Sequence, residues 1–177
     1  MRPTTTLLAS LLLLAASCGG GGSDPAAQVD AGYSSLSSGD ADAALSSFDG
    51  ALSGMESSDP KFLEAKVGQC QALSHVDPAK ARTELLGLAK DSGVTAKDYS
   101  MVVTEMVSAA TSQAATDQKA ATATIGEAVA ILTQGKQTFP EYDKWDALIK
   151  KTGDKAATLG SADALESLKG LGYVGGD

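Results

Sequence analysis

The sequence predicts an all-α protein, and three observations support this prediction. Alanine is abundant, and apolar residues recur at helical spacing over most of the chain beyond residue 24. The alternation of apolar and polar residues that marks strands is weak. Three Asp-Pro pairs, at 24–25, 59–60 and 77–78, each place an N-cap acceptor before a proline at the first position of a helix. Helices joined by short turns become antiparallel neighbours, so we expect a series of helical hairpins.

The helix boundaries follow from capping signals and glycines. Thr95 and Asp98 match a variant of the capping box that starts a helix. Helix stops are assigned to glycines, because glycine adopts the left-handed C-cap conformation without steric cost. The glycines concerned are Gly39, Gly93, Gly135 and Gly153. The predicted helices span residues 25–38, 40–54, 60–75, 78–91, 96–114, 117–134, 141–152 and 162–170. The first six pair into three hairpins.

The start of the chain has the order of a secretory signal peptide. Arg2 precedes an apolar run that is shorter than the about 20 residues a membrane-spanning helix needs. The run ends in Ala-Ala-Ser-Cys, which resembles a bacterial lipobox. The resemblance implies that residues 1–17 are a lipoprotein signal peptide, that Cys18 carries the lipid, and that residues 18–24 form a glycine-rich tether. The alternative is an ordinary signal peptide that leaves Cys18 as a free thiol.

The lipobox-like segment and the charge together limit the location and the partners. A lipidated Cys18 would anchor the protein in a membrane of the bacterial cell envelope, and Gly19 after it resembles outer-membrane sorting, facing the periplasm or the cell surface. The net charge of −8 disfavours nucleic acid and anionic lipid headgroups as partners, because both repel an acidic protein. An envelope protein or peptide is the partner we expect.

An internal repeat relates the three hairpins. Ala44, Phe48 and Ala51 lie on one helical face, and Gly32 removes a side chain where the first two helices would cross. The row recurs 37 residues later, and again after a further 40. The recurring residues are Ala81, Leu85 and Leu88, with Gly68 as the small crossing residue, and then Ala121, Ile125 and Ala128, with Ala109 as the small residue.

The first copy resembles the tetratricopeptide repeat. The shared features are the Ala-x-x-x-Phe-x-x-Ala row and the segment 39–44 (Gly-Asp-Ala-Asp-Ala-Ala), which is similar to the family's turn between its two helices. The family repeat is about 34 residues, and the copies here are longer and degenerate. The resemblance implies a short solenoid of stacked hairpins over residues 25–135. The alternative is three generic hairpins with alanine-rich contacts.

Residues 136–177 depart from this period and are expected to form a cap and a tail. Tyr142, Trp145, Leu148 and Ile149 form one apolar stripe, which predicts a helix that covers the end of the third hairpin. A second stripe ends in Leu-x-x-Leu-Gly-Tyr, which resembles C-terminal tails of some bacterial repeat proteins and sulfatase-like proteins. We expect this tail to dock against the domain, or against a partner.

The chain offers few groups for catalysis, so we expect no enzymatic activity, no cofactor and no metal site. His75 is the one histidine, and its place at a helix C-terminus suits an interaction with the helix dipole. Zinc would need further histidine or cysteine ligands. Cys70 lies among small and apolar residues of a predicted helix, which is typical of a buried structural thiol, and we expect no disulfide with Cys18.

The repeat resemblance implies a function as a binding scaffold. In that family the first helix of each repeat lines a groove that accepts a peptide or a partner helix. Carried over position by position, this nominates Tyr33, Leu36, Lys66, Gln69, Met106 and Gln113 as partner-binding residues. The alternative is a structural lipoprotein that docks to another envelope component through its tail, with no ligand in the groove.

Overall fold

The computed structural model describes residues 24–90 and 93–175, and it is all-helical there. Its eight helices are α1 (Pro25–Ser37), α2 (Ala41–Ser53), α3 (Phe62–Val76), α4 (Pro78–Leu88), α5 (Ala96–Gln113), α6 (Gln118–Thr138), α7 (Trp145–Leu159) and α8 (Ala162–Gly170). The all-α prediction is therefore confirmed for this part of the chain.

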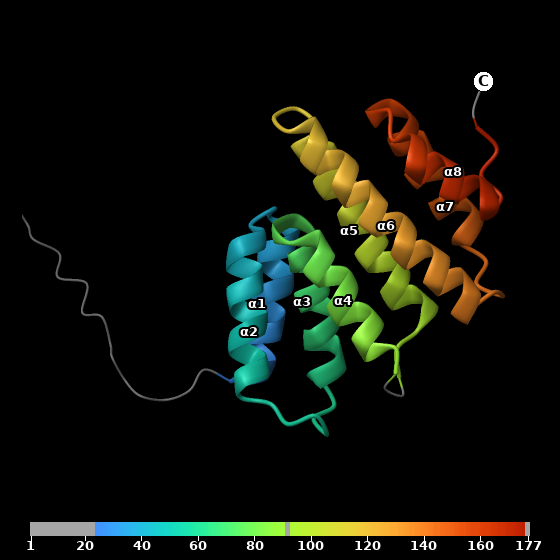
Figure 1. Cartoon of the computed structure of the whole chain (residues 1–177). Coiled ribbons are helices and arrows are strands. Elements are labelled where there is room, and N and C mark those ends of the chain that lie inside the picture. The colour runs from blue at the N-terminus through green and yellow to red at the C-terminus, as the bar shows by residue number, and fades with distance from the viewer. Residues whose placement is uncertain (1–23, 91–92, 176–177) are drawn as a thin grey trace, which may run out of the picture.

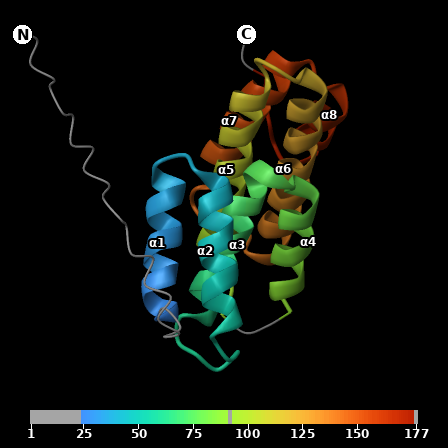
Figure 2. The same ribbon diagram turned by 90° about the vertical axis from the view of Figure 1, so that its left-hand side faces the viewer.

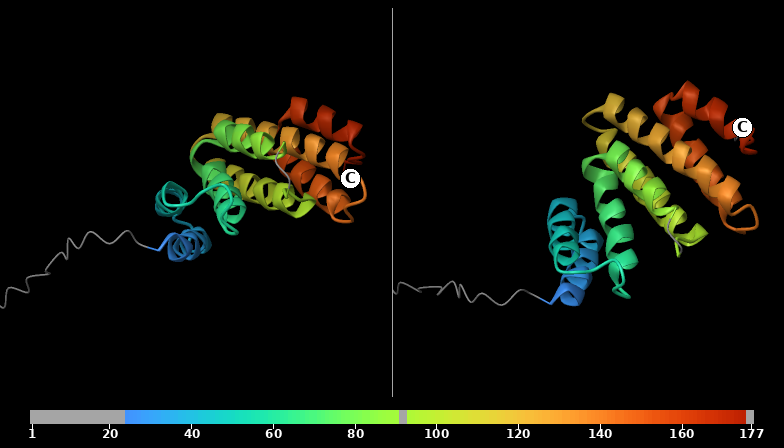
Figure 3. Two further views of the ribbon diagram at one scale, coloured as in Figure 1. Left: turned by 90° about the horizontal axis from the view of Figure 1, so that it is seen from below. Right: turned by 60° about the horizontal axis from the view of Figure 1, so that its bottom comes forward.

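The helices form sequential hairpins that follow one another across the molecule (Figure 1). Each odd-numbered helix contacts the even-numbered helix that follows it, and their axes run along one another (Figure 2). Contacts from α1 to α3, from α3 to α5 and from α5 to α7 join the odd-numbered helices in a row. Contacts from α4 to α6 and from α6 to α8 join the later even-numbered helices in a second row beside the first, whereas α2 packs against α3 (Figure 3). The predicted stacking of hairpins is confirmed.

The last two helices form a fourth hairpin that continues both rows. α7 contacts α5, and α8 contacts α6. In the same way, α5 contacts α3 and α6 contacts α4. Its sequence also repeats the row of the earlier hairpins, because Ala164, Leu168 and Leu171 have the same spacings of four and three. Ala164 and Leu168 are buried, and Leu171 packs partly buried against the same core. Residues 136–177 thus hold more than the cap and tail expected of them.

The capping predictions are confirmed at three helices and wrong at one. The Asp24 and Asp77 carboxylates accept hydrogen bonds from Ala26 N (3.1 Å) and Lys80 N (3.0 Å) at the starts of α1 and α4. In the predicted capping box, Thr95 N donates to the Asp98 carboxylate at 2.8 Å. Asp59 instead accepts from Lys61 N in a turn, and α3 begins two residues after Pro60.

Two of the predicted glycine stops are instead positions of close packing inside helices. Gly135 lies within α6, where a Cβ would come within 2.6 Å of the Trp145 ring. Gly153 lies within α7, where a Cβ would overlap the ring of Tyr173. Both helices therefore run on past the predicted ends, and α7 stops at Gly160, which has a φ of 68°.

Phe48 is the centre of the N-terminal core. It is fully buried with Ala44 and Ala51, as the row predicted. A Cβ on Gly32 would lie 2.7 Å from its ring, and a Cβ on Gly68 would overlap the ring as well. Gly68, predicted as the crossing residue of its own hairpin, therefore accommodates a side chain of the preceding hairpin.

The second and third rows also belong to the core as predicted. Their residues are almost fully buried in one large cluster that runs through the other three hairpins. They are Ala81, Leu85, Leu88, Ala121, Ile125 and Ala128, and Ala109 is buried close by.

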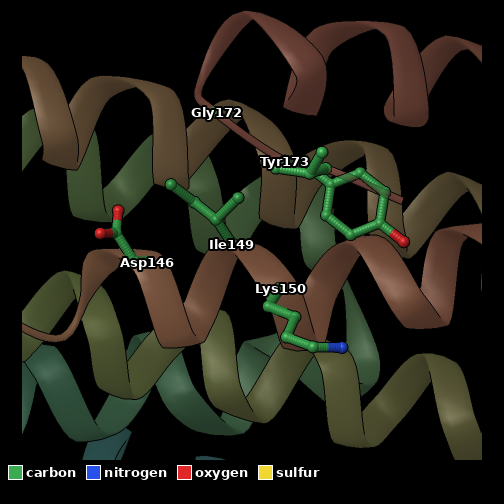
Figure 4. Close-up of a pocket in the computed structure, with 6 residues that line it drawn as sticks. Asp146, Ile149, Lys150, Gly172 and Tyr173 are labelled. Atoms are coloured by element: carbon green, nitrogen blue, oxygen red, sulfur yellow. The ribbon is translucent and has the colours of Figure 1, made fainter. Parts of the chain in front are cut away.

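The chain beyond α8 folds back over α7. Tyr173 donates a hydrogen bond from its hydroxyl to Asp154 at 3.3 Å, and its ring lies against Gly153. The Leu171 carbonyl accepts from Lys136 Nζ at 2.9 Å. Figure 4 shows Tyr173 and Gly172 beside Ile149 and Lys150 of α7. Docking of the tail against the domain, one of the two outcomes expected, is thus observed as far as Tyr173.

Candidate functional site

Two neighbouring pockets lie on the face made by the odd-numbered helices. The first lies between Tyr33 of α1, Val67 of α3 and Met101 of α5. The second lies between the turn that follows α1, His75 of α3 and Glu105 of α5. Both pockets are lined by the same three elements, so together they follow α3 along its length. We call the two pockets and the α3 residues between them the α3 groove.

One stripe of α3 forms the floor of the groove. Glu64, Val67, Gln71 and His75 are spaced by three, four and four residues, which places them on one helical face. Glu64 and Val67 line the first pocket, and His75 lines the second. Gln71 falls between them on this face of α3 and is among the lining residues of neither pocket.

Tyr33 forms the α1 wall of the first pocket. Its ring packs edge-on against Phe48, with ring centroids 5.1 Å apart, and its hydroxyl donates to the Glu64 carbonyl at 3.0 Å. Burial, and then the negative charges of Glu64 and Asp98, raise the pKa of Tyr33 to about 12. The Tyr33 hydroxyl therefore remains protonated over the physiological range.

The second pocket contains a polar bridge between two odd-numbered helices. His75 Nε2 lies 3.0 Å from Glu105 Oε2, and both side chains are partly buried. Leu36 and the exposed Val76 add apolar surface beside them. His75 lies in the last turn of α3, as predicted. The sequence did not indicate its contact with Glu105 of α5.

Gln71 is buried in the floor without a partner for its amide nitrogen. Its side chain is 6% exposed, and Nε2 has no hydrogen-bond partner. A buried donor without an acceptor costs about 1–3 kcal/mol, so most such groups in folded proteins are paired. The neighbouring Ser74 shows the usual outcome, since its hydroxyl donates to the Cys70 carbonyl at 2.9 Å.

The partner-binding residues nominated from the sequence separate into two groups. Tyr33 and Leu36 line the α3 groove, one in each pocket. Lys66 Nζ lies 3.9 Å from Glu84 Oε2 of α4, and Gln69 Nε2 donates a hydrogen bond to Asp49 Oδ1 of α2. Both side chains therefore point to even-numbered helices.

The two residues nominated on α5 are engaged within the protein, Met106 as a buried residue and Gln113 as a partly buried one. Met106 is fully buried in the core, and Gln113 accepts a hydrogen bond from Thr124 of α6 at 2.8 Å. On α3, the difference between the nominated residues and those that line the pockets follows from the placement of Gly68. The sequence register treated Gly32 and Gly68 as equivalent, whereas one faces its own hairpin and the other faces the preceding one. Val67, Gln71 and Glu105 were therefore missed. The recurrence of Glu64, Val67, Gln71 and His75 on one helical face was the one signal for the α3 residues.

Cys70 is buried, as predicted, and Cys18 lies outside the described residues. Burial, followed by the charge of Glu84, raises the pKa of the Cys70 thiol to about 12. Because the thiolate is the nucleophile, a thiol with so high a pKa is unreactive.

The described residues, 24–90 and 93–175, contain neither a candidate metal-binding group nor a candidate membrane-spanning helix. Within these ranges, no group of three or more His, Cys, Asp or Glu side chains is placed to hold a metal ion. None of the helices there combines the length and the apolar character needed to cross a bilayer.

Comparison with known proteins gave no match. No protein-family model, no curated protein and no solved structure matches the chain. The fold itself therefore defines the class: an all-helical protein whose described helices pack as sequential hairpins.

Proposed function

We propose that this protein is a lipid-anchored scaffold of the bacterial cell envelope that binds a protein or peptide in the α3 groove, through stacked hairpins of the tetratricopeptide type. The observation that carries the proposal is the position of the two pockets. Both have lining residues on the three odd-numbered helices α1, α3 and α5, and apolar side chains such as Leu36 and Met101 occur there with charged ones. Binding sites are typically apolar concavities with a few polar groups that fix orientation.

The tail supports the groove over the alternative of tail-mediated docking. Tyr173 is already engaged with Gly153 and Asp154 of its own α7. A partner that captured the tail would have to displace these contacts. The groove demands no such rearrangement.

Site-specific crosslinking tests the groove. A photo-crosslinking amino acid at Ser108, an exposed groove residue of α5, is expected to give a discrete crosslinked product in intact envelopes. The matched control carries the same group at Ser46, which is exposed on α2. Equal products from both positions, or none from Ser108, would contradict a partner in the groove.

The lipid anchor is tested by fractionation. Cys18→Ala removes the thiol that would be acylated, and we expect the protein to move from the membrane to the soluble fraction. Two acyl chains hold a protein on a membrane stably, at about 0.8 kcal/mol for each buried methylene. Cys70→Ala is the control, because this thiol is buried, and it should leave the protein in the membrane fraction. A Cys18→Ala protein that still sediments with membranes would exclude the lipid anchor.

A further inference from the structure

The tail lies at the open end of the row of odd-numbered helices. α3 packs on α1, α5 packs on α3 and α7 packs on α5, so each of these helices gives the next one a surface. Within the described residues, no further helix follows α8 to pack on α7. The chain beyond α8 lies against α7 instead, at the end of the stack away from α1 (Figure 1). The tail thus takes the place in which a further hairpin would extend the row.

The contact between the tail and α7 uses a glycine position that recurs in the stack. Gly153 lies 11 residues before the first residue of the recurring row, and Gly32 and Gly68 lie 12 and 13 residues before it in their hairpins. A Cβ on Gly32 or Gly68 would meet the ring of Phe48. A Cβ on Gly153 would overlap the ring of Tyr173. The tail therefore packs on α7 by the kind of contact that joins the first two hairpins.

The end of α8 directs Tyr173 onto α7. Gly172 has a φ of 100°, in the left-handed region that glycine adopts without steric cost. Gly172 N donates to the Lys169 carbonyl at 3.0 Å, and Tyr173 N donates to the Leu168 carbonyl at 2.9 Å. This pair of hydrogen bonds is the Schellman motif of helix C-termini. The motif turns the chain back, so the position of the Tyr173 ring follows from the way α8 ends.

Few contacts hold the tail in place. The Tyr173 hydroxyl donates at 3.3 Å to Asp154, which is exposed, and the Val174 side chain that follows is 87% exposed. Segments with few buried contacts open locally without unfolding the rest of a protein. Release of the tail would uncover Gly153 and the neighbouring Ile149 on α7. The end of the row would then be open.

We propose that the tail is a strap that ends the stack and keeps a second copy of the chain off α7. With the strap released, the uncovered face of α7 accepts α1 of a second copy, because this continues the contact between successive odd-numbered helices. Within the described residues no hairpin precedes α1, and Ala27, Ala31 and Ser34 are exposed on one of its faces. The contact joins two different surfaces, so each added copy offers another α7 and growth does not close. The strap prevents this open-ended association.

Two variants that release the strap test the proposal. Tyr173→Ala removes the ring, and a chain that ends at Leu171 removes the strap; both are made in the Cys18→Ala protein so that no lipid contributes to association. In sedimentation velocity we expect each to form oligomers that grow with protein concentration, whereas the parent protein and the Val174→Ala control stay monomeric. Salt of about 0.15 M or more is used, because it screens the net charge of −8 that opposes contact between copies.

A substitution on α1 tests the second surface. Added to Tyr173→Ala, Ala31→Arg places a long charged side chain on the exposed face of α1 and should restore the monomer. Ser46→Arg, on an exposed position of α2, is the matched control and should leave the oligomers unchanged. Oligomers that persist with Ala31→Arg would overturn α1 as the surface that meets α7.

Two further outcomes would overturn the strap itself. One is that both strap variants stay monomeric at every concentration. The other is a loss of helical circular dichroism in Tyr173→Ala, which would show that the tail does not open separately from the core. The strap lies outside the α3 groove, so neither outcome bears on the proposed function.

Discussion

Phe48→Ala is expected to lower the free energy of unfolding by about 3–5 kcal/mol, the range for removing a buried phenylalanine. The side chain is fully buried, and the N-terminal core around it is small. Since Gly32 and Gly68 have no side chains to move into the space, the cavity would persist. Urea denaturation followed by circular dichroism measures the loss.

A second pair of substitutions tests whether the Phe48 ring requires glycine at position 68 for steric reasons. Gly68→Ala is expected to cost about 1–3 kcal/mol, because its methyl group would overlap the Phe48 ring. In a Phe48→Leu background the cost should fall, since leucine is smaller than phenylalanine and the equivalent Leu85 is accommodated in the second hairpin. An equal cost of Gly68→Ala in both backgrounds would refute the steric account.

Trp145→Ala should be about as destabilising, again by about 3–5 kcal/mol. The Trp145 side chain is 1% exposed and packs against Gly135 of α6, and its Nε1 donates to the Phe139 carbonyl at 2.7 Å. The substitution would remove both the packing and the hydrogen bond that hold the start of α7 to the end of α6. Thermal and urea unfolding by circular dichroism give the change.

Two controls accompany this prediction. Trp145→Phe keeps most of the apolar surface and loses the hydrogen bond, so an intermediate loss of about 1–2 kcal/mol is expected. Val174→Ala lies in the tail, where the side chain is 87% exposed, and should change stability by less than about 0.5 kcal/mol. A Trp145→Ala protein as stable as Val174→Ala would show that the fourth hairpin is not held by this contact.

The sequence allowed most helices to be placed, because their determinants are local. An aspartate before a proline starts α1 and α4, and the buried row around Phe48 recurs at fixed spacing in α4 and α6. The same row in α8 was overlooked, although Ala164 and Leu168 repeat it with the same spacing.

The sequence alone could not show which glycines end a helix and which make room for a neighbouring side chain. A glycine that ends a helix and one that makes room for a neighbouring ring are the same letter, and the difference lies in a distant side chain. Gly160 ends α7 with a left-handed conformation, whereas Gly153 lies within that helix under Tyr173. The groove residues of α3 were missed for the same reason, because the register was carried from Gly32 to Gly68.

The position of α3 between two cores has a consequence for ligand linkage. Its residues Ala65 and Ala72 belong to the N-terminal core, and Cys70 and Leu73 belong to the large core. Detachment of the first hairpin would therefore remove Tyr33 and one wall of the α3 groove while the large core stayed intact. A peptide in the groove would then bind only the closed form and would protect α1 and α2 from local opening in proportion to its concentration. Hydrogen exchange of α1 and α2 would thus report occupancy of the groove.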